Sequence, residues 1–390
     1  MPKPLNRFLY RLLLSALIIG VLVAAFLFMI VRRNVTLSGF LDPGRLADIS
    51  VPPGFVVNVY AQGLNQPRFI AFGPDGVLYV ADRANNRIVY LPDADSDGVA
   101  DETQVFAADV PSPHSLTFYA ATAAWYVGVP TGVIELKDTD GDGQADQRKV
   151  LIDNYPTFGH STRTVLFLPD GRLVVSIGSS CNVCVESDPR RAGIVVYDGP
   201  AATGEKIFAT GLRNAVGLAL NPLTGELWAT NNGRDLMGDD LPPETVDIVK
   251  EGADFGWPRC HAGEVIDPEF GSPDSCNGVE PPILKMQAHS APLGLAFYTG
   301  TTFPAEYQND LFIAFHGSWN RSEPTGYKVV RVDLQDGLPL GPAQDFATGF
   351  AQLTEDDVFG RPVGLAVGPD GALYVSDDKG GFIYRISYRK

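Results

Sequence analysis

The chain has 390 residues, 45% of them hydrophobic and 19% charged, and a net charge of −16. This hydrophobic share excludes a disordered chain and is enough for one large domain or two ordinary ones. The negative charge would repel a phosphate backbone, so it argues against a protein that binds nucleic acid. The 41 Gly, 30 Pro, 22 Phe and 14 Tyr residues favour many short strands joined by turns over long helices.

An apolar segment stands near the N-terminus. Residues 12–31 contain no charged side chain, and a helix of that length, at about 1.5 Å per residue, would span a bilayer. A cleaved signal peptide is the alternative, but its apolar region would be shorter and small residues would mark the cleavage site. We therefore expect a cytoplasmic tail and a single transmembrane helix over residues 1–33, a linker over 34–50 and a folded domain over 51–390.

Four cysteines form two local pairs. Cys181 and Cys184 make a C-x-x-C motif, and Cys260 and Cys276 flank a second loop. An even number in two pairs predicts two disulfides in an oxidising compartment. One zinc ion held by four thiolates is the alternative, although the spacing is unlike that of a zinc ribbon. With the anchor, the pairs predict a single-pass cell-membrane protein whose folded domain faces the periplasm or the exterior.

A hairpin pattern recurs along the chain, in which two apolar strands flank a turn such as Pro-Asp-Gly. Pro presets φ and Gly accepts a positive φ, so this turn favours a hairpin. The copies begin at Phe69, Ser115, Val165, Gly217, Gly294 and Gly364. Six hairpins leave about 60 residues for each, which fits a four-stranded propeller blade. The sequence thus predicts an all-β, six-bladed β-propeller, with a pair of β-sandwiches as the alternative.

The predicted ring needs a closure. Residues 54–60 form an apolar segment ahead of the first hairpin. We expect this segment to add the outer strand to the last blade, which ends near Ile386.

A basic residue precedes the inner strand of every predicted blade. These residues are Arg68, His114, Arg163 with His160, Arg213, His289 and Arg361. The loops that enter the inner strands of a propeller meet at one end of its central channel. Cations gathered there in an acidic chain predict a shared site for an anionic ligand.

Several motifs, in order, resemble the soluble PQQ-dependent sugar dehydrogenases, in particular their sorbosone and pyranose dehydrogenase-like branch. The resemblance covers roughly residues 50–388. The motifs are Gly159-His-Ser-Thr-Arg-Thr164, Cys181-Asn-Val-Cys184, Gly211-Leu-Arg-Asn214, Asn232-Gly-Arg-Asp235, Phe255-Gly-Trp-Pro258, His289-Ser-Ala-Pro292 and His316-Gly-Ser-Trp-Asn-Arg321.

The resemblance implies an oxidoreductase that oxidises a sugar or sugar aldehyde by hydride transfer to pyrroloquinoline quinone (PQQ). PQQ carries three carboxylates, which suit a basic ring. His160 is implied as the general base. The expected cofactor-binding residues are Arg68, His114, Arg163, Arg213, Asn214, Arg361 and either His316 or Arg321, since the glucose enzymes have a Lys where this chain has residues 316–321.

Calcium is implied as a second cofactor. By the family pattern, Ca²⁺ beside PQQ takes the backbone carbonyls of Gly233 and Arg234 and would polarise the quinone. The carboxylates of Asp239, Asp240 and Glu244 resemble a neighbouring structural calcium loop. A solvated turn is the alternative for these three.

Two further acidic loops lie outside the resemblance. One holds Asp93, Asp95, Asp97 and Asp101, and the other holds Asp138, Asp140, Asp142 and Asp146. Carboxylates at alternate positions before a Gly match the first half of an EF-hand loop, but the Glu at position 12 is missing from both. Calcium-bound hairpin turns and plain acidic turns both fit this pattern.

Two other functions remain as alternatives. A calcium-dependent lactonase-type hydrolase also uses a six-bladed propeller, but it would need Glu, Asn and Asp around a metal where this chain has cations. A non-catalytic binding propeller is the second. The expected partners of an oxidoreductase are a small sugar substrate and an electron acceptor, either a membrane quinone or a cytochrome.

Overall fold

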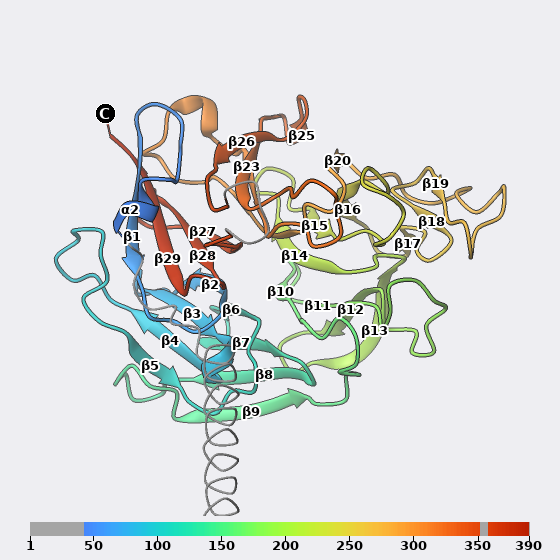
Figure 1. Ribbon diagram of the computed structural model, residues 1–390. Helices are drawn as coiled ribbons and strands as arrows, with labels where there is room; N and C mark the ends of the chain where they lie inside the picture. The colour runs from blue at the N-terminus through green and yellow to red at the C-terminus, as the bar shows by residue number, and fades with distance from the viewer. Residues whose placement is uncertain (1–42, 352–357, 390) are drawn as a thin grey trace, which may run out of the picture. The chain divides into compact units, whose positions relative to one another are not determined.

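The computed structural model describes residues 43–351 and 358–389, and these form a ring of six sheets (Figure 1). The prediction of a six-bladed propeller is therefore confirmed. The predicted membrane anchor lies outside the described residues. Within the described ranges, no helix is both long enough and apolar enough to cross a bilayer.

The blades follow one another along the chain, and in each the first strand is innermost. Blade 1 is β2 (Pro67–Phe72), β3 (Leu78–Asp82), β4 (Arg87–Leu91) and β5 (Gln104–Ala107). Blade 2 is β6 (Ser115–Tyr119), β7 (Ala124–Val129), β8 (Gly132–Lys137) and β9 (Gln147–Ile152). Blade 3 is β10 (Val165–Phe167), β11 (Leu173–Ile177), β12 (Gly193–Asp198) and β13 (Thr203–Thr210), extended by β17 (Ala253–Asp254).

The second half of the ring repeats this order. Blade 4 is β14 (Ala215–Leu220), β15 (Leu227–Asn231), β16 (Glu244–Val249) and β20 (Leu284–Met286). Blade 5 is β21 (Pro292–Phe297), β22 (Leu311–Phe315), β23 (Lys328–Val332) and β26 (Gln344–Ala347). Short additions are α2 (Pro43–Leu46), η1 (Arg83–Asn85), η2 (Ala305–Tyr307), the ribbon β18 (Cys260–His261) with β19 (Val265–Ile266), and the ribbon β24 (Leu334–Gln335) with β25 (Leu338–Pro339).

Blade 6 joins the two ends of the described chain. It contains β27 (Pro362–Val367), β28 (Leu373–Asp377), β29 (Phe382–Tyr388) and, as its outer strand, β1 (Phe55–Ala61). β1 pairs antiparallel with β29, with Phe55 opposite Tyr388, and Figure 1 shows the blue β1 beside the red β29. The predicted closure by the segment before the first hairpin is confirmed.

Apolar side chains fill the spaces between neighbouring blades. Between blades 1 and 2, for example, the rings of Tyr79 and Trp125 lie 4.4 Å apart, in a buried cluster that includes Ile88 and Val127. An isolated hairpin has too little apolar contact to be stable in water. Each blade is therefore stabilised mainly by packing between its two neighbours.

The inner strands approach so closely that some positions have no room for a side chain. A Cβ on Gly217 would lie 2.2 Å from the carbonyl oxygen of Leu293 in the next blade. The buried hydroxyl of Thr230, on β15, links these two residues, because it accepts the Gly217 N–H at 2.9 Å and donates to Leu293 O at 2.6 Å. Ser376 links Gly364 to Arg68 in the same way. Such hydroxyls fix the spacing of the inner strands.

We expect Thr230→Val to lower the free energy of unfolding by about 2 to 4 kcal/mol, because the buried Gly217 N–H and Leu293 carbonyl would both lose their partner while the shape stays the same. Urea denaturation would measure this loss. Thr203→Val, at an exposed position of β13, is the control and should change stability by less than about 0.5 kcal/mol. Equal losses for the two variants would show that the hydroxyl does not link the blades.

Candidate functional site

Apart from His160, which lies five residues before β10, the six predicted basic residues lie where their inner strands begin, at one end of the channel. Arg68 is the second residue of β2, and the others precede their strands by one to three residues. Arg68, His114, Arg163, Arg213 and His289 are buried. Their surroundings separate them into three sets. One set lies around Asp378 and one lies around Asp235. The remaining residues bind backbone carbonyls.

The first group centres on Asp378, just after β28. Its carboxylate accepts a hydrogen bond from Arg68 Nη1 at 2.5 Å and lies 2.9 Å from His316 Nε2. Arg361 Nη1 lies 3.4 Å from His316 Nδ1, and Arg68 Nε lies 3.4 Å from His114 Nδ1. Two of the predicted cofactor-binding residues thus contact the Asp378 carboxylate directly, and His114 and Arg361 join the group through contacts with those two.

Burial and mutual charge set the ionisation of this group. Burial alone would raise the pKa of Asp378, but His316 and Arg68 beside it hold that pKa far below its ordinary value. Burial lowers the pKa of His316, although Asp378 opposes the shift. Burial and the neighbouring Arg68 hold the pKa of His114 well below its ordinary value, so His114 is neutral at physiological pH.

The second group contains His160, on the loop that enters blade 3. Its Nδ1 lies 3.0 Å from both the carbonyl oxygen and the hydroxyl oxygen of Ser179. The Ser179 hydroxyl donates its own hydrogen to Cys181 O at 2.7 Å. Both oxygens are therefore acceptors toward the ring, so Nδ1 carries the proton and the lone pair is on Nε2. Burial and the nearby Arg213 lower the pKa of His160 to about 4.

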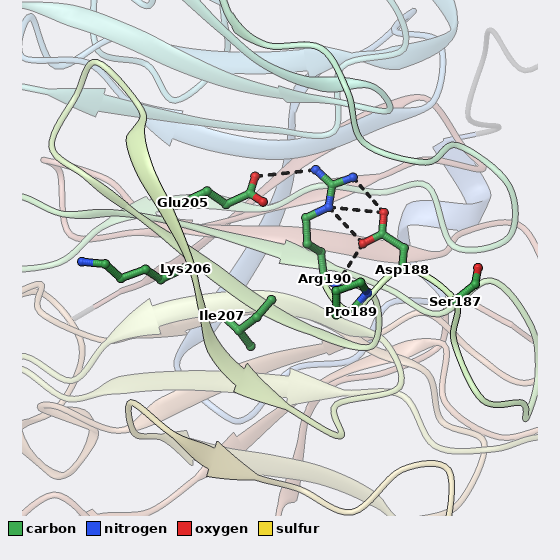
Figure 2. Close-up of a pocket in the computed structure, with 7 residues that line it drawn as sticks. All are labelled: Ser187, Asp188, Pro189, Arg190, Glu205, Lys206 and Ile207. Atoms are coloured by element: carbon green, nitrogen blue, oxygen red, sulfur yellow. Dashed lines mark hydrogen bonds and ion pairs between the residues drawn. The ribbon is translucent and has the colours of Figure 1, made fainter.

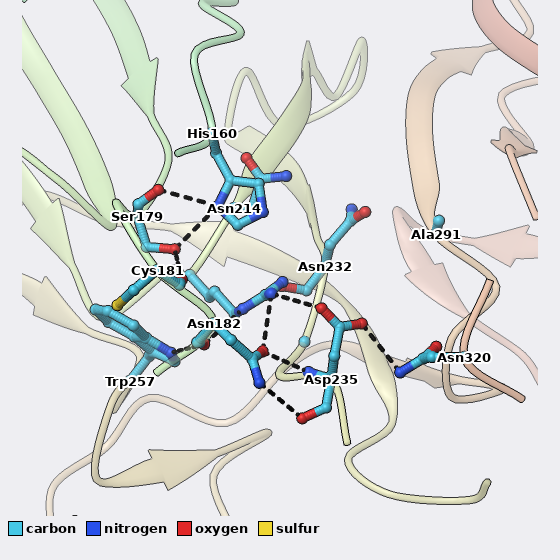
Figure 3. Close-up of polar contacts among 12 residues, drawn as sticks. His160, Ser179, Cys181, Asn182, Asn214, Asn232, Asp235, Trp257, Ala291 and Asn320 are labelled. Atoms are coloured by element: carbon cyan, nitrogen blue, oxygen red, sulfur yellow. Dashed lines mark hydrogen bonds and ion pairs between the residues drawn. The ribbon is translucent and has the colours of Figure 1, made fainter. Parts of the chain in front are cut away.

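Arg213 and Asn214 lie beside His160, at the entry to blade 4. Gly178 makes this approach possible, since a Cβ there would lie 2.5 Å from Asn214 Oδ1 and 2.6 Å from His160 Cβ. Arg213 forms an ion pair, at 2.8 Å between Nη2 and Oδ2, with the partly buried Asp235 that Figure 3 labels. Its Nη1 contacts Asn232 O at 3.5 Å. Among the described residues, the Asn214 amide group has no hydrogen-bond partner.

The segment 233–235 is held on three sides. The Gly233 N–H donates to Glu244 at 2.6 Å, Arg234 pairs with Asp267, and Asp235 pairs with Arg213. The carbonyl oxygens of Gly233 and Arg234 accept no hydrogen bond from any residue that the structure describes. Free carbonyls on a fixed backbone are ligands that Ca²⁺ accepts, so this segment fits the implied calcium position.

The other predicted calcium ligands in this region do not converge. Asp239 accepts from Ser322 and Asp240 from Arg321 Nη1, whereas Glu244 is buried and accepts from the backbone of Gly233 and Ala291. Burial raises the pKa of Glu244 to about 7, although these backbone donors oppose the shift. Among the described residues, Asp239, Asp240 and Glu244 belong to no cluster of side chains whose ligand atoms lie close enough to share an ion.

Three predicted or ring residues point away from both groups. Arg163 is fully buried and donates to the carbonyls of Pro156, His160 and Thr162, so it fixes the loop that carries His160. Arg321 binds the 239–240 turn. His289 contacts Gly238 O at 2.8 Å. Of the pair 316 and 321, it is His316 that joins the group around Asp378.

The acidic loops occupy the opposite end of the blades, because each joins a third strand to a fourth. Asp93, Asp95 and Asp97 bring their oxygens together between β4 and β5, and Asp138, Asp140 and Asp146 do so between β8 and β9. Asp142 instead accepts the N–H of Gln144. Backbone N–H groups of the same turns satisfy these carboxylates in both loops, so the structure fits a plain acidic turn as well as a calcium loop.

Both predicted disulfides are present, Cys181–Cys184 and Cys260–Cys276. The first lies beside Ser179 and His160. The second closes the insertion that carries β18 and β19, whose Asp267 holds Arg234 and lies 2.9 Å from His261 Nε2. Each bridge therefore supports one side of the candidate site.

A surface pocket of about 490 Å³ lies elsewhere, along the outer strand β13 (Figure 2). Arg190 in this pocket is paired with Asp188 and Glu205. A guanidinium with two carboxylate partners has little capacity for an anionic ligand, so we place the site at the mouth of the channel.

Comparison with known proteins identifies the family of this chain. A family model described as a domain of unknown function (DUF7133) matches residues 44–383. The chain belongs to the DUF7133 family. This DUF7133 protein is also homologous to PQQ-dependent sugar dehydrogenases, in agreement with the resemblance in its motifs.

Two relatives are 27% identical to this DUF7133 chain. One is a PQQ-dependent pyranose dehydrogenase of Coprinopsis cinerea, over 87% of this chain and 54% of the relative. The other is a PQQ-dependent sugar dehydrogenase of Hypocrea jecorina, over 85% of this chain and 87% of the relative. An uncharacterized protein of Borreliella burgdorferi is 36% identical over 57% of this chain and 58% of its own length. The chain thus spans between half and three fifths of the Borreliella burgdorferi and Coprinopsis cinerea relatives.

A solved structure supports the fold. The calcium structure of a carbohydrate-active enzyme of family AA12 from Trichoderma reesei matches with a TM-score of 0.75 and 25% identity, over 87% of this chain and 97% of that one. The holo form of the PQQ domain of the Coprinopsis cinerea pyranose dehydrogenase has the same TM-score at 24% identity, over 87% and 97% of the two chains.

Sequence reasoning missed the acids and amides that partner the basic ring. Asp378 lies in an ordinary turn after β28, and Asp235 and Asn182 stand within quoted motifs without an assigned role. Ser179, which sets the His160 tautomer, precedes the C-x-x-C motif. A ring of buried cations requires counter-charges, which was the one available signal that such aspartates exist.

We expect Asp378→Asn to lower the free energy of unfolding at pH 7 by about 3 kcal/mol, because Arg68 would lose its buried counter-charge. The depressed pKa gives the sign of the pH dependence. The contribution of Asp378 is present above the ordinary Asp pKa and is lost as the pH falls through the depressed value. Chemical denaturation at pH 7 and pH 2 would test both statements.

The matched control is Asp345→Asn, since Asp345 pairs with Lys328 at 2.5 Å but is 57% exposed. We expect this variant to lose at most about 1 kcal/mol. A loss for Asp378→Asn no larger than that of the control would show that the first group needs no counter-charge.

Proposed function

We propose that this chain is a PQQ-dependent oxidoreductase that oxidises a sugar or sugar aldehyde of the sorbosone, glucose or pyranose type. The observation that carries the proposal is the state of His160. Its Nδ1–H is bound to Ser179, which leaves the Nε2 lone pair as a base beside Arg213 and Asn214. A neutral, oriented imidazole next to fixed donors is what removal of a hydroxyl proton requires.

The donor set fits the proposed cofactor. PQQ is an anionic ortho-quinone, and Arg213, Asn214 and the cations around Asp378 offer charge and hydrogen bonds that suit carboxylates and quinone oxygens. The free carbonyls of Gly233 and Arg234 would hold Ca²⁺. When bound, PQQ would accept the hydride of the substrate, and Ca²⁺ would make the quinone a better acceptor.

The residues of the chain would then have separate roles. His160 Nε2 accepts the proton of the substrate hydroxyl, and Ser179 keeps the ring in the required tautomer. Arg213 and Asn214 would bind and orient the cofactor on one side. On the other side, Arg68 and Arg361 would provide positive charge and His316 would offer a hydrogen bond. A lactonase-type hydrolase would need carboxylates free to bind a metal there, whereas Asp378 and Asp235 are paired with basic side chains.

We further propose that residues 1–33 anchor the protein in the cell membrane, with the propeller in the periplasm or outside the cell. The uncharged run over residues 12–31 and the two disulfides support this placement. A membrane quinone or a cytochrome would then be the electron acceptor.

We expect His160→Asn to lower turnover with a sugar by about 10²- to 10⁴-fold, because no base accepts the hydroxyl proton. The affinity for PQQ should change by no more than about threefold. Steady-state dye reduction would give the turnover, and equilibrium dialysis would give PQQ binding. Turnover equal to that of the wild type would remove His160 from the mechanism.

The pH profile of the wild type offers an independent check on His160. Its pKa is lowered to about 4, and only the neutral ring can act as a base. The ratio kcat/KM should therefore stay on a plateau above that pKa and fall as the pH drops through about 4. An acid limb near pH 6.5 would mean that the ring titrates as an exposed histidine does.

Removal of calcium should abolish activity and lower the melting temperature, because the metal would both activate the quinone and bind only the folded chain. Chelation followed by elemental analysis and a thermal scan would measure the two effects. Restored activity on adding Ca²⁺ is the control. Full activity after verified metal loss would contradict the assignment of Gly233 and Arg234.

A further inference from the structure

One residue between the two cysteines of the C-x-x-C motif holds the centre of the site together. Asn182 O accepts from Arg213 Nε at 2.9 Å and from Trp257 Nε1 at 3.3 Å. Its side-chain Oδ1 accepts from Arg213 Nη2 at 3.0 Å and from the Asp235 N–H at 2.8 Å. Its Nδ2 donates to Asp235 O at 3.0 Å. Figure 3 shows Asn182 next to Asp235 and Trp257.

These contacts fix one edge of the Arg213 guanidinium. The Nε and Nη2 groups are taken by Asn182 and Asp235, so the Nη1 side, which has only a 3.5 Å contact to Asn232 O, is the part left for a ligand. A guanidinium held along one edge has little freedom to rotate, and its remaining donors keep a constant direction.

Asn182 belongs to blade 3, whereas Arg213 and Asp235 belong to loops of blade 4. The C-x-x-C loop therefore reaches across a boundary between blades. The Cys181–Cys184 bridge and the bonds from Ser180 N and Oγ to Glu186, at 2.6 and 2.8 Å, hold this loop in shape. Asn320, from blade 5, completes the junction by donating to Asp235 Oδ1 at 3.2 Å.

We propose that Asn182, held by the Cys181–Cys184 bridge, is a positioning residue that directs Arg213 toward the cofactor. The inference rests on the proposed function, since it concerns the binding of PQQ. The bridge then contributes to cofactor affinity, whereas a disulfide that only stabilised a surface loop would not. The residue itself acts through Arg213 and has no direct part in the reaction.

The test is a double-mutant cycle on PQQ affinity, measured by equilibrium dialysis in the presence of Ca²⁺. We expect Asn182→Ala to weaken PQQ binding about tenfold in the wild-type background, because Arg213 loses a charge-assisted hydrogen bond. In an Arg213→Lys background the same change should alter affinity by less than about twofold, since lysine cannot make the paired contacts.

A second variant addresses the bridge directly. Cys181→Ser with Cys184→Ser keeps Asn182 but frees its loop, and we expect a loss of PQQ affinity similar to that of Asn182→Ala. This variant also keeps the test open if Asn182→Ala does not fold. The control is Asn221→Ala, which removes a buried asparagine that binds Leu223 N and Gly337 O at the far end of β14. It should lower thermal stability and leave PQQ affinity unchanged.

The outcomes separate this inference from the proposed function. Wild-type affinity in both Asn182→Ala and the double serine variant would overturn the positioning role while leaving the enzyme assignment intact. An equal loss in the wild-type and Arg213→Lys backgrounds would also overturn it, because Asn182 would then act independently of Arg213. Absence of PQQ binding by the wild-type chain would overturn the proposed function and this inference with it.

Discussion

The pairing of β1 with β29 is the interaction on which the site depends. Through it the first and last strands of the propeller share one sheet, so blade 6 lies against blade 1 and the inner strands form a closed ring. The hydroxyls of Thr230 and Ser376 then set the distance between neighbouring inner strands. Only in a closed ring do the six loops that enter these strands face one another, which is how residues from Arg68 to Asp378 come into contact.

The closed ring creates an electrostatic problem that the structure resolves in two ways. Buried cations are unfavourable unless they are paired. Asp378 pairs with Arg68 and His316, and Asp235 pairs with Arg213. Arg163 instead donates from its two Nη groups to three backbone carbonyls. The ring is therefore less positive than a list of its basic residues implies, and its capacity for an anion lies in specific donors, such as Arg213 Nη1, rather than in an overall excess of charge.

The fold could be predicted from the sequence, because the hairpin repeat is local and the Pro and Gly of each Pro-Asp-Gly turn favour the backbone angles of a hairpin. The sequence also placed His160, Arg213 and Asn214 near one another, since each precedes an inner strand. It could not pair Arg68 with Asp378, or Arg213 with Asn182, because these contacts join residues far apart in the chain and depend on side-chain direction. The sequence also could not show which way the Arg321 side chain points, or that Glu244 lies apart from Asp239 and Asp240.

The segment 233–235 shows what the surrounding scaffold achieves. Three consecutive residues are tied to three different supports: Glu244 in β16, Asp267 in the disulfide-bridged insertion, and Arg213 at the entry to blade 4. Such a backbone is preorganised, since its carbonyls keep their direction before any ligand arrives. Little conformational entropy remains to be lost on binding, so an ion held by only a few protein oxygens could still bind tightly, and its affinity would depend on the distant bridge between Cys260 and Cys276.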